Sequence, residues 1–378
     1  MRSQYFQATF RIARKSKKNM LLAVLLVLCM IFAVLVVEKQ KINDGYRQWR
    51  DYNESVHVNA DYFSSNLLRK KDYKQTFNNL NKQAEYLAGV QNGEVFDSPQ
   101  DYLQNSKKLV QTMLAGYQNN YRGASTLNVP PKYQLQQKLV VYDYLYQHHL
   151  AIVMNSKESS TYLIYILGLV GMFLFFYVLF IASDSWMINL SHPTLLKNIP
   201  YQIRDEVEGK FIINLALTLL PLVIGVLGSY LFAGFKNGFN SLNYPAVLYF
   251  GKISAVPLWL YCLLYLVYAV VLVMFVTSLA LLLNQLTHSV YLTIFIAALV
   301  YSISLLPGSI AKYLFFLPSA YLNISKVLDG TVASQSIIPA NWAVGMTILL
   351  VWAVVLVIWF RHLVNPVSYT HLTLPTIC

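Results

Sequence analysis

The sequence predicts an all-α membrane protein with six transmembrane helices and a mostly helical extracellular domain between the first and the second. Composition supports this class, because 56% of the 378 residues are hydrophobic and only 12% are charged, whereas soluble domains carry about 25% charge. Several stretches without charged residues reach about 18 residues or more, which is long enough to span a bilayer. We therefore expect the lipid bilayer to surround most of the chain.

The net charge of +12 does not require a nucleic-acid partner, and we expect none. Six of the 29 basic residues lie in the cytoplasmic N-terminal segment, residues 1–19, directly before the first span at 20–37. Such a flank is typical of a segment held on the cytoplasmic side. The text after this span, "VVEKQK", lacks a small-residue cleavage site, so we expect an anchor and not a cleaved signal peptide.

Residues 38–158 are polar and rich in tyrosine, and they predict the extracellular helical domain. Ser98 and Pro99 can begin one helix, as an N-cap and a first-turn proline. The text "KYQLQQKLVVYDYLYQHHLAIV", residues 132–153, predicts another. His148 and His149 diverge by about 100° on a helix and make a poor metal pair. We expect a small helical bundle or hairpin, whose tyrosines either form its core and surface or bind a ligand.

The rest of the chain up to residue 365, residues 159–365, predicts five more spans. Each is an apolar stretch that contains no Asp, Glu, Lys, Arg or His, and the five lie at 161–183, 211–235, 257–283, 290–310 and 342–360. A short loop, 236–252, precedes the fourth span. The segment between the last two spans is broken by proline and glycine, so we expect it not to cross the membrane.

Six spans place both termini on one side, and basic residues indicate which side. With the N-terminus inside, the short inner segments hold ten Lys and Arg residues and the short outer loops hold four: Lys236, Lys252, Lys312 and Lys326. The positive-inside rule then predicts cytoplasmic N- and C-termini in the cell membrane. Residues 184–210, a charged elbow between the second and third spans, are then cytoplasmic.

The elbow contains "SHPTLLKNIPYQIRDEVEGK", which predicts two short amphipathic helices separated by a bend at Pro200. In the second helix, Ile203, Val207 and Phe211 are spaced by four and share one face, while charged residues occupy the rest. One interpretation is a membrane-surface loop with one wet face. The other is a docking surface, with Leu195 and Leu196 as apolar anchors beside charges that set the register.

The order of these parts resembles the permease subunit of a type-2 ABC transporter, the export class. "LLKNIPYQIRDEVEGKFI" is similar to the coupling-helix pattern of that family, and "FLPSAYLNISKVLDG" resembles its outer segment before the last span. The roughly 120-residue outer domain departs from compact members, although larger exporter relatives carry insertions at this place. The resemblance covers nearly all of residues 1–365.

This resemblance implies a complex of two permease copies, or a permease and a paralogue, with two cytoplasmic ABC ATPase subunits. The chain itself has no G-x-x-x-x-G-K-[ST] phosphate loop, so ATP and Mg are expected on the partner. We expect no catalytic, cofactor or metal site on this chain. The expected ATPase contacts are His192, Leu195, Leu196, Lys197, Ile203, Arg204, Asp205 and Glu206. The exported substrate is open among peptides, drugs, lipid-like molecules and ions.

Two alternatives remain. An ion-coupled secondary transporter normally keeps titratable groups inside its spans, and their lack here counts against that class, although carbonyls and hydroxyls can hold sodium. A membrane sensor or assembly protein would use the extracellular domain to bind a peptide, lipid or envelope polymer.

Residues 366–378 are expected not to belong to the native protein. Their text "VSYTHLTLPT" resembles a translated sequencing adapter, and such additions say nothing about the fold.

Overall fold

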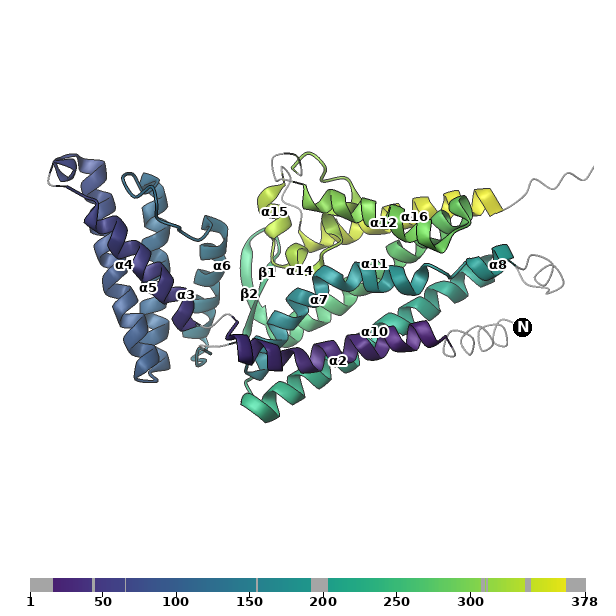
Figure 1. The fold of residues 1–378 in the computed structure, drawn as a ribbon, viewed down its shortest axis with the longest axis horizontal. Helices are drawn as coiled ribbons and strands as arrows, with labels where there is room; N and C mark the ends of the chain where they lie inside the picture. The colour runs from purple at the N-terminus through teal and green to yellow at the C-terminus, as the bar shows by residue number, and fades with distance from the viewer. Residues whose placement is uncertain are drawn as a thin grey trace, which may run out of the picture.

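The computed structural model describes residues 16–42, 45–64, 66–153, 156–191, 203–306, 310, 312–336 and 341–364. Most of the basic N-terminal segment, the middle of the elbow and the adapter-like tail lie outside the described residues. Two parts of the chain are distinct in Figure 1: a bundle of long apolar helices, and a separate group of helices at one end of it.

Five helices of the bundle are long and apolar enough to cross a membrane, which makes the chain a multi-pass membrane protein. They run alongside one another (Figure 1), and they are α2 (Lys17–Gln40), α7 (Ser159–Ala182), α10 (Ile203–Asn237), α11 (Leu258–Thr287) and α16 (Trp342–Val364). Each contains one of the predicted spans or nearly all of it. Helix α11 is the most buried of the five and packs against α7, α10 and α16.

The fifth predicted span, 290–310, is shorter in the structure. Helix α12 covers Val290–Ser302 and continues as the 3-10 turn η3, Ile303–Leu305, so its length falls below the usual 17–25 residues of a spanning helix. Leu306 is extended, with ψ near 147°, as expected for the residue that precedes Pro307. The six-span count is therefore not confirmed, because this helix is apolar but short.

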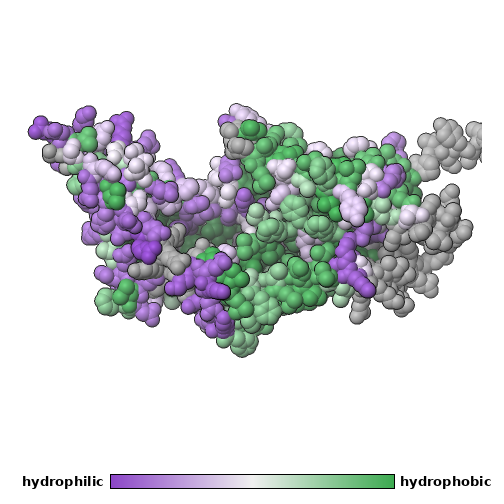
Figure 2. All heavy atoms as spheres, viewed as in Figure 1, coloured by the Kyte–Doolittle hydropathy of each residue, from purple (hydrophilic) through white to green (hydrophobic). Residues whose placement is uncertain are grey.

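The surface of the bundle fits a lipid environment. Figure 2 shows apolar side chains over the bundle and polar ones over the group of helices at its end. Trp342 and Trp359 lie near opposite ends of α16, with Trp359 half exposed. They are separated by roughly 26 Å of helix, close to the ~30 Å hydrocarbon core. Aromatic residues at both ends are typical of membrane interfaces.

The group at the end of the bundle is hereafter the helical domain, residues 45–153. It contains α3 (Gly45–Asp61), α4 (Lys71–Val95), α5 (Pro99–Gly116) and α6 (Lys132–Gln147), with the 3-10 turns η1 (Leu67–Arg69) and η2 (Tyr117–Asn119). It has its own hydrophobic core, in which Leu80, Leu109 and Met113 are fully buried. Helix α5 begins at Pro99 as predicted. Helix α6 ends earlier than predicted, because His149 has a left-handed backbone with φ near 51°.

A two-stranded hairpin lies where the sequence predicted a short loop, residues 236–252, and the start of the fourth span. Strands β1 (Pro245–Tyr249) and β2 (Ile253–Pro257) pair antiparallel, with Pro245 opposite Pro257. Both strands pack against α6. The all-α class therefore holds for the bundle and the helical domain, and the hairpin between them is the exception.

In the described residues 312–336, between the last two apolar helices, the helices are short, and the sequence predicted that this segment does not span the membrane. These helices are η4 (Pro318–Tyr321), α14 (Ile324–Leu328) and α15 (Thr331–Gln335). Two tyrosine hydroxyls of α11 donate to backbone carbonyl oxygens of neighbouring elements: Tyr268 to Tyr321 of η4 at 2.9 Å, and Tyr265 to Leu167 of α7 at 3.2 Å. Gly225 of α10 lies against Met30 of α2, which permits a close helix contact.

Candidate functional site

The elbow end is the end of the bundle at which α7 stops and α10 begins. Helix α7 ends at Ala182, and a turn leads to α8, Met187–Ser191. Residues 192–202 lie outside the described residues, and with them four of the predicted contacts: His192, Leu195, Leu196 and Lys197. The structure describes the two sides of the elbow, including Ile203, Arg204, Asp205 and Glu206.

The first turns of α10 show the predicted division into two faces. Val207 is buried, and Ile203 and Phe211 are partly buried and pack against the bundle core. Arg204 points outward and its Nε donates to Oε1 of Glu208, one turn later, at 2.8 Å. An exposed pair of this type contributes little to stability.

Glu206 behaves differently from its charged neighbours. It is only 3% exposed, and its Oε1 accepts a hydrogen bond of 2.6 Å from Nδ2 of Asn189 on α8. A hydrogen bond to a charged group is among the stronger ones in proteins. Glu206 therefore joins the two sides of the elbow, and any effect it has on a docked partner acts through the position of α8.

A polar layer continues from the elbow into the bundle. Nδ2 of Asn214 on α10 lies 3.2 Å from Oγ1 of Thr277 on α11 and 3.4 Å from Oγ of Ser185. Asn214 and Thr277 are both buried, and buried polar groups require such partners. Asn214 was not among the predicted functional residues, although an asparagine within an apolar helix is a signal that the sequence contains.

Trp186 and Lys18 attach the turn of the elbow to three more helices. The indole N–H of Trp186 donates to Oε1 of Gln285 on α11 at 2.9 Å, and its ring meets Phe360 of α16 edge to face. Nζ of Lys18 on α2 lies 2.7 Å from Oδ2 of Asp184. The turn thus contacts α2, α11 and α16.

A second set of contacts joins the helical domain to the opposite end of the bundle. The Tyr133 hydroxyl and the Gln137 side-chain amide, both on α6, donate to the backbone oxygen of Asp329 at 2.7 and 2.8 Å. Burial raises the pKa of the Asp329 carboxyl, and its Oδ1 accepts from the Thr331 amide at 2.8 Å. We call these contacts, with Gly330, the α6 joint.

Lys138 directly follows Gln137 on α6. Its Nζ lies 4.6 Å from the centre of the Trp49 ring on α3, a cation–π arrangement that favours the charged form. Burial acts in the opposite sense and lowers the pKa of Lys138 to about 8. The α6 helix therefore carries an ionisable group close to physiological pH next to the joint.

Comparison of the chain with protein-family models, curated proteins and solved structures finds no match.

Proposed function

We propose that the chain is the membrane-spanning permease subunit of an ATP-driven exporter, and that the elbow is the contact for a separate ATPase. The observation that carries the proposal is the two-sided elbow between the second and third long apolar helices. Its outward face carries Arg204 and Glu208, and its inward side is fixed through Trp186 and Lys18 to the helices of the bundle.

This arrangement suits the transmission of force. A partner that pushes on the elbow would move α8 and the start of α10 together, because Glu206 holds them to each other. The same movement would reach α2, α11 and α16 through the contacts of the turn. In this proposal ATP and Mg bind to the partner chain, the elbow end faces the cytoplasm, and a second permease copy or a paralogue completes the complex.

A pull-down tests the proposal. The tagged chain is isolated from its own host in mild detergent, and accompanying proteins are identified and assayed for ATPase activity. We expect a stoichiometric ATPase with a phosphate loop. Replacing both Leu195 and Leu196 with Asp should remove it while the chain still inserts and folds.

A charge exchange on α10 supplies the matched control. Arg204→Glu places two acidic groups one turn apart, and Arg204→Glu with Glu208→Arg restores their attraction in the reverse order. If the outward face docks the ATPase, both variants lose it. Recovery in the double variant would assign the defect to helix stability. A folded chain that brings down no ATPase, even after crosslinking, would contradict the proposal.

A further inference from the structure

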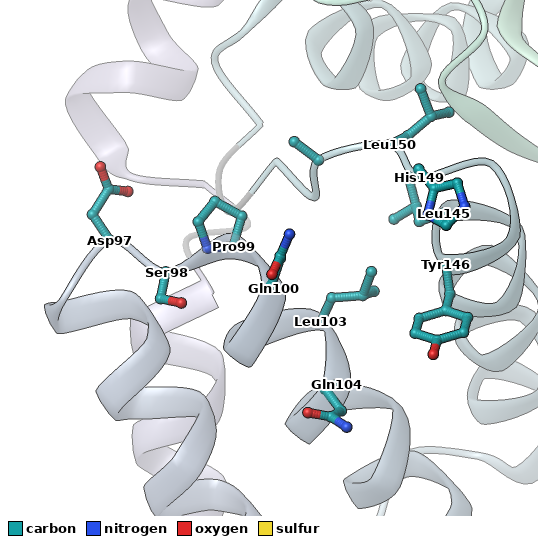
Figure 3. Close-up of a pocket in the computed structure, with 11 residues that line it drawn as sticks. Asp97, Ser98, Pro99, Gln100, Leu103, Gln104, Leu145, Tyr146, His149 and Leu150 are labelled. Atoms are coloured by element: carbon teal, nitrogen blue, oxygen red, sulfur yellow. The ribbon is translucent and has the colours of Figure 1, made fainter.

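A cavity of about 690 Å³ opens in the helical domain between the start of α5 and the end of α6. Its volume lies within the roughly 300–1,000 Å³ range of small-ligand pockets. Six side chains face it from two sides, three from α5 and three from the end of α6 and the turn after it (Figure 3): Gln100, Leu103, Gln104, Leu145, Tyr146 and His149.

One exposed aromatic side chain lines this cavity, and two exposed apolar residues precede its rim in the sequence. Tyr146 is 60% exposed, and Val95 and Phe96, at 70% and 77%, directly precede Asp97 at the rim. Among the side chains described in the helical domain, the other large apolar ones with such exposure are Val58 and Tyr62. Exposed apolar groups beside a concave site are typical of binding surfaces.

The charge at the α5 side of the rim is negative. Asp97 lines the cavity, and Asp101, which accepts a hydrogen bond of 2.7 Å from the Ser98 hydroxyl, lies one turn further on. Lys107 approaches the ring of Tyr146, but its ammonium is paired with Asp143 at 2.7 Å. A cationic ligand would therefore meet carboxylates at the rim and aromatic faces beside them.

The wall also offers uncharged hydrogen-bonding groups. Gln100 and Gln104 are one turn apart on α5 and both are exposed. Each side-chain amide can donate and accept, which matches the alternating N–H and C=O groups of a peptide backbone. Leu103 on α5 and Leu145 at the end of α6 form the floor of the cavity from its two sides, and both are buried in the core of the helical domain.

We propose that this cavity binds a cationic amphipathic peptide. A basic side chain of the peptide lies at Asp97, an apolar side chain packs against the exposed ring of Tyr146, and the peptide amides bond to Gln100 and Gln104. The binding requires no ATPase and goes beyond the proposed transport function. Loss of the ATPase in the pull-down would leave it unaffected.

Peptide binding to the full chain provides the test. The chain is reconstituted in phosphatidylcholine nanodiscs, and a fluorescent 14-residue peptide of lysine and leucine in an amphipathic pattern is titrated by anisotropy, with empty nanodiscs as the blank. A matched peptide carries glutamate in place of lysine. We expect the cationic peptide to bind at least about tenfold more tightly, and hydrogen exchange to slow at residues 97–104 and 145–151.

Two variants and two matched controls locate the site. Asp97→Asn removes the charge and tolerates the left-handed backbone of this residue, φ near 49°, and Tyr146→Ala removes the exposed ring. Asp61→Asn and Tyr62→Ala make the same changes near the opposite end of α4. We expect the first pair to weaken binding about three- to tenfold each, and the controls to bind within about twofold of the unchanged chain.

Four results would overturn the proposal. The glutamate peptide could bind as tightly as the lysine peptide. The Asp97 and Tyr146 variants could bind no more weakly than their controls. The signal could equal that of empty nanodiscs, which would assign the binding to lipid. A small aromatic cation that binds where the peptide does not would also contradict a peptide site.

Discussion

The hydroxyl of Tyr177 on α7 donates a hydrogen bond of 2.9 Å to the backbone oxygen of Leu217 on α10. That carbonyl lies four residues before Pro221, which sits inside α10 and has no N–H to donate to it. The tyrosine therefore satisfies the acceptor that proline leaves open. This contact explains how a long apolar helix tolerates proline in its interior.

Replacing Tyr177 with Phe should destabilise the bundle by about 1–3 kcal/mol, because a buried carbonyl then lacks a donor. Replacing Pro221 with Ala supplies an N–H, so Tyr177→Phe should cost much less in that background. Thermal unfolding in detergent of the four combinations gives the coupling between the two residues. Equal costs in both backgrounds would show that the hydroxyl does not compensate for the proline.

Glu206 should position α8 through its hydrogen bond to Asn189. Glu206→Ala leaves the Asn189 amide without this acceptor, and we expect faster hydrogen exchange in residues 187–191 and weaker retention of the ATPase. Glu206→Gln keeps an acceptor oxygen and should stay close to the unchanged chain. If both variants loosen α8 equally, the negative charge and not the hydrogen bond holds the elbow.

Lys138 should make the stability of the chain depend on pH above neutrality. Its pKa of about 8 in the folded chain lies below the usual 10.5, so the unfolded chain binds more protons between these values and this residue's contribution to stability rises with pH. Below pH 8 Lys138 is charged in both the folded and the unfolded chain, and the cost of burying its charge remains. This cost is roughly 3 kcal/mol, and the attraction of the ammonium to Trp49 reduces it.

The variant Lys138→Met should therefore be more stable than the unchanged chain at pH 7, and the gain should shrink as the pH approaches 10. Thermal unfolding of both proteins at pH 7, 8, 9 and 10 measures this difference. Tyrosine titration is common to both chains and cancels in the comparison. A gain that stays constant with pH would show that Lys138 keeps an ordinary pKa.

Gly330 should be required for the α6 joint. It has a φ near 77°, and an added Cβ would lie 2.2 Å from the Tyr133 hydroxyl and 2.5 Å from Cβ of Tyr249. We expect Gly330→Ala to cost several kcal/mol through strain and clash, and to speed proteolysis between the helical domain and the bundle. Gly251 has nearly the same φ, 78°, with open space around it.

Gly251→Ala is therefore the matched control, because it carries the backbone strain without the clash. The difference in unfolding temperature between the two variants measures the packing at the joint. Similar behaviour of the two variants would mean that the strain of the backbone, and not the contact with α6, makes glycine necessary.

Much of the bundle could be predicted from local sequence, and the hairpin could not. Helices such as α7 and α16 are continuous apolar stretches, and in a bilayer such a stretch must satisfy its own backbone by forming a helix. Strands β1 and β2 are five residues each and begin or end with proline, so their local pattern is weak. They form because each strand supplies the other's hydrogen bonds and α6 covers them.

In the elbow, too, local sequence predicted some residue positions, and tertiary packing decided others. The spacing of Ile203, Val207 and Phe211 predicted the apolar face of α10, because the helical period fixes which residues share a face. The spacing placed Glu206 with the exposed charges, whereas the structure buries it against Asn189. Its burial depends on α8, a neighbour that the sequence of α10 does not specify.

The sequence by itself determined that this chain is a multi-pass membrane protein with a polar insertion after its first apolar helix. Hydrophobicity, length and helical period are local properties, and they suffice for that conclusion. Only the tertiary structure decided that Asn214 meets Thr277, that Tyr133 meets Asp329, and that a cavity forms between α5 and α6. Each of these joins segments distant in sequence, and their meeting depends on how the helices pack together.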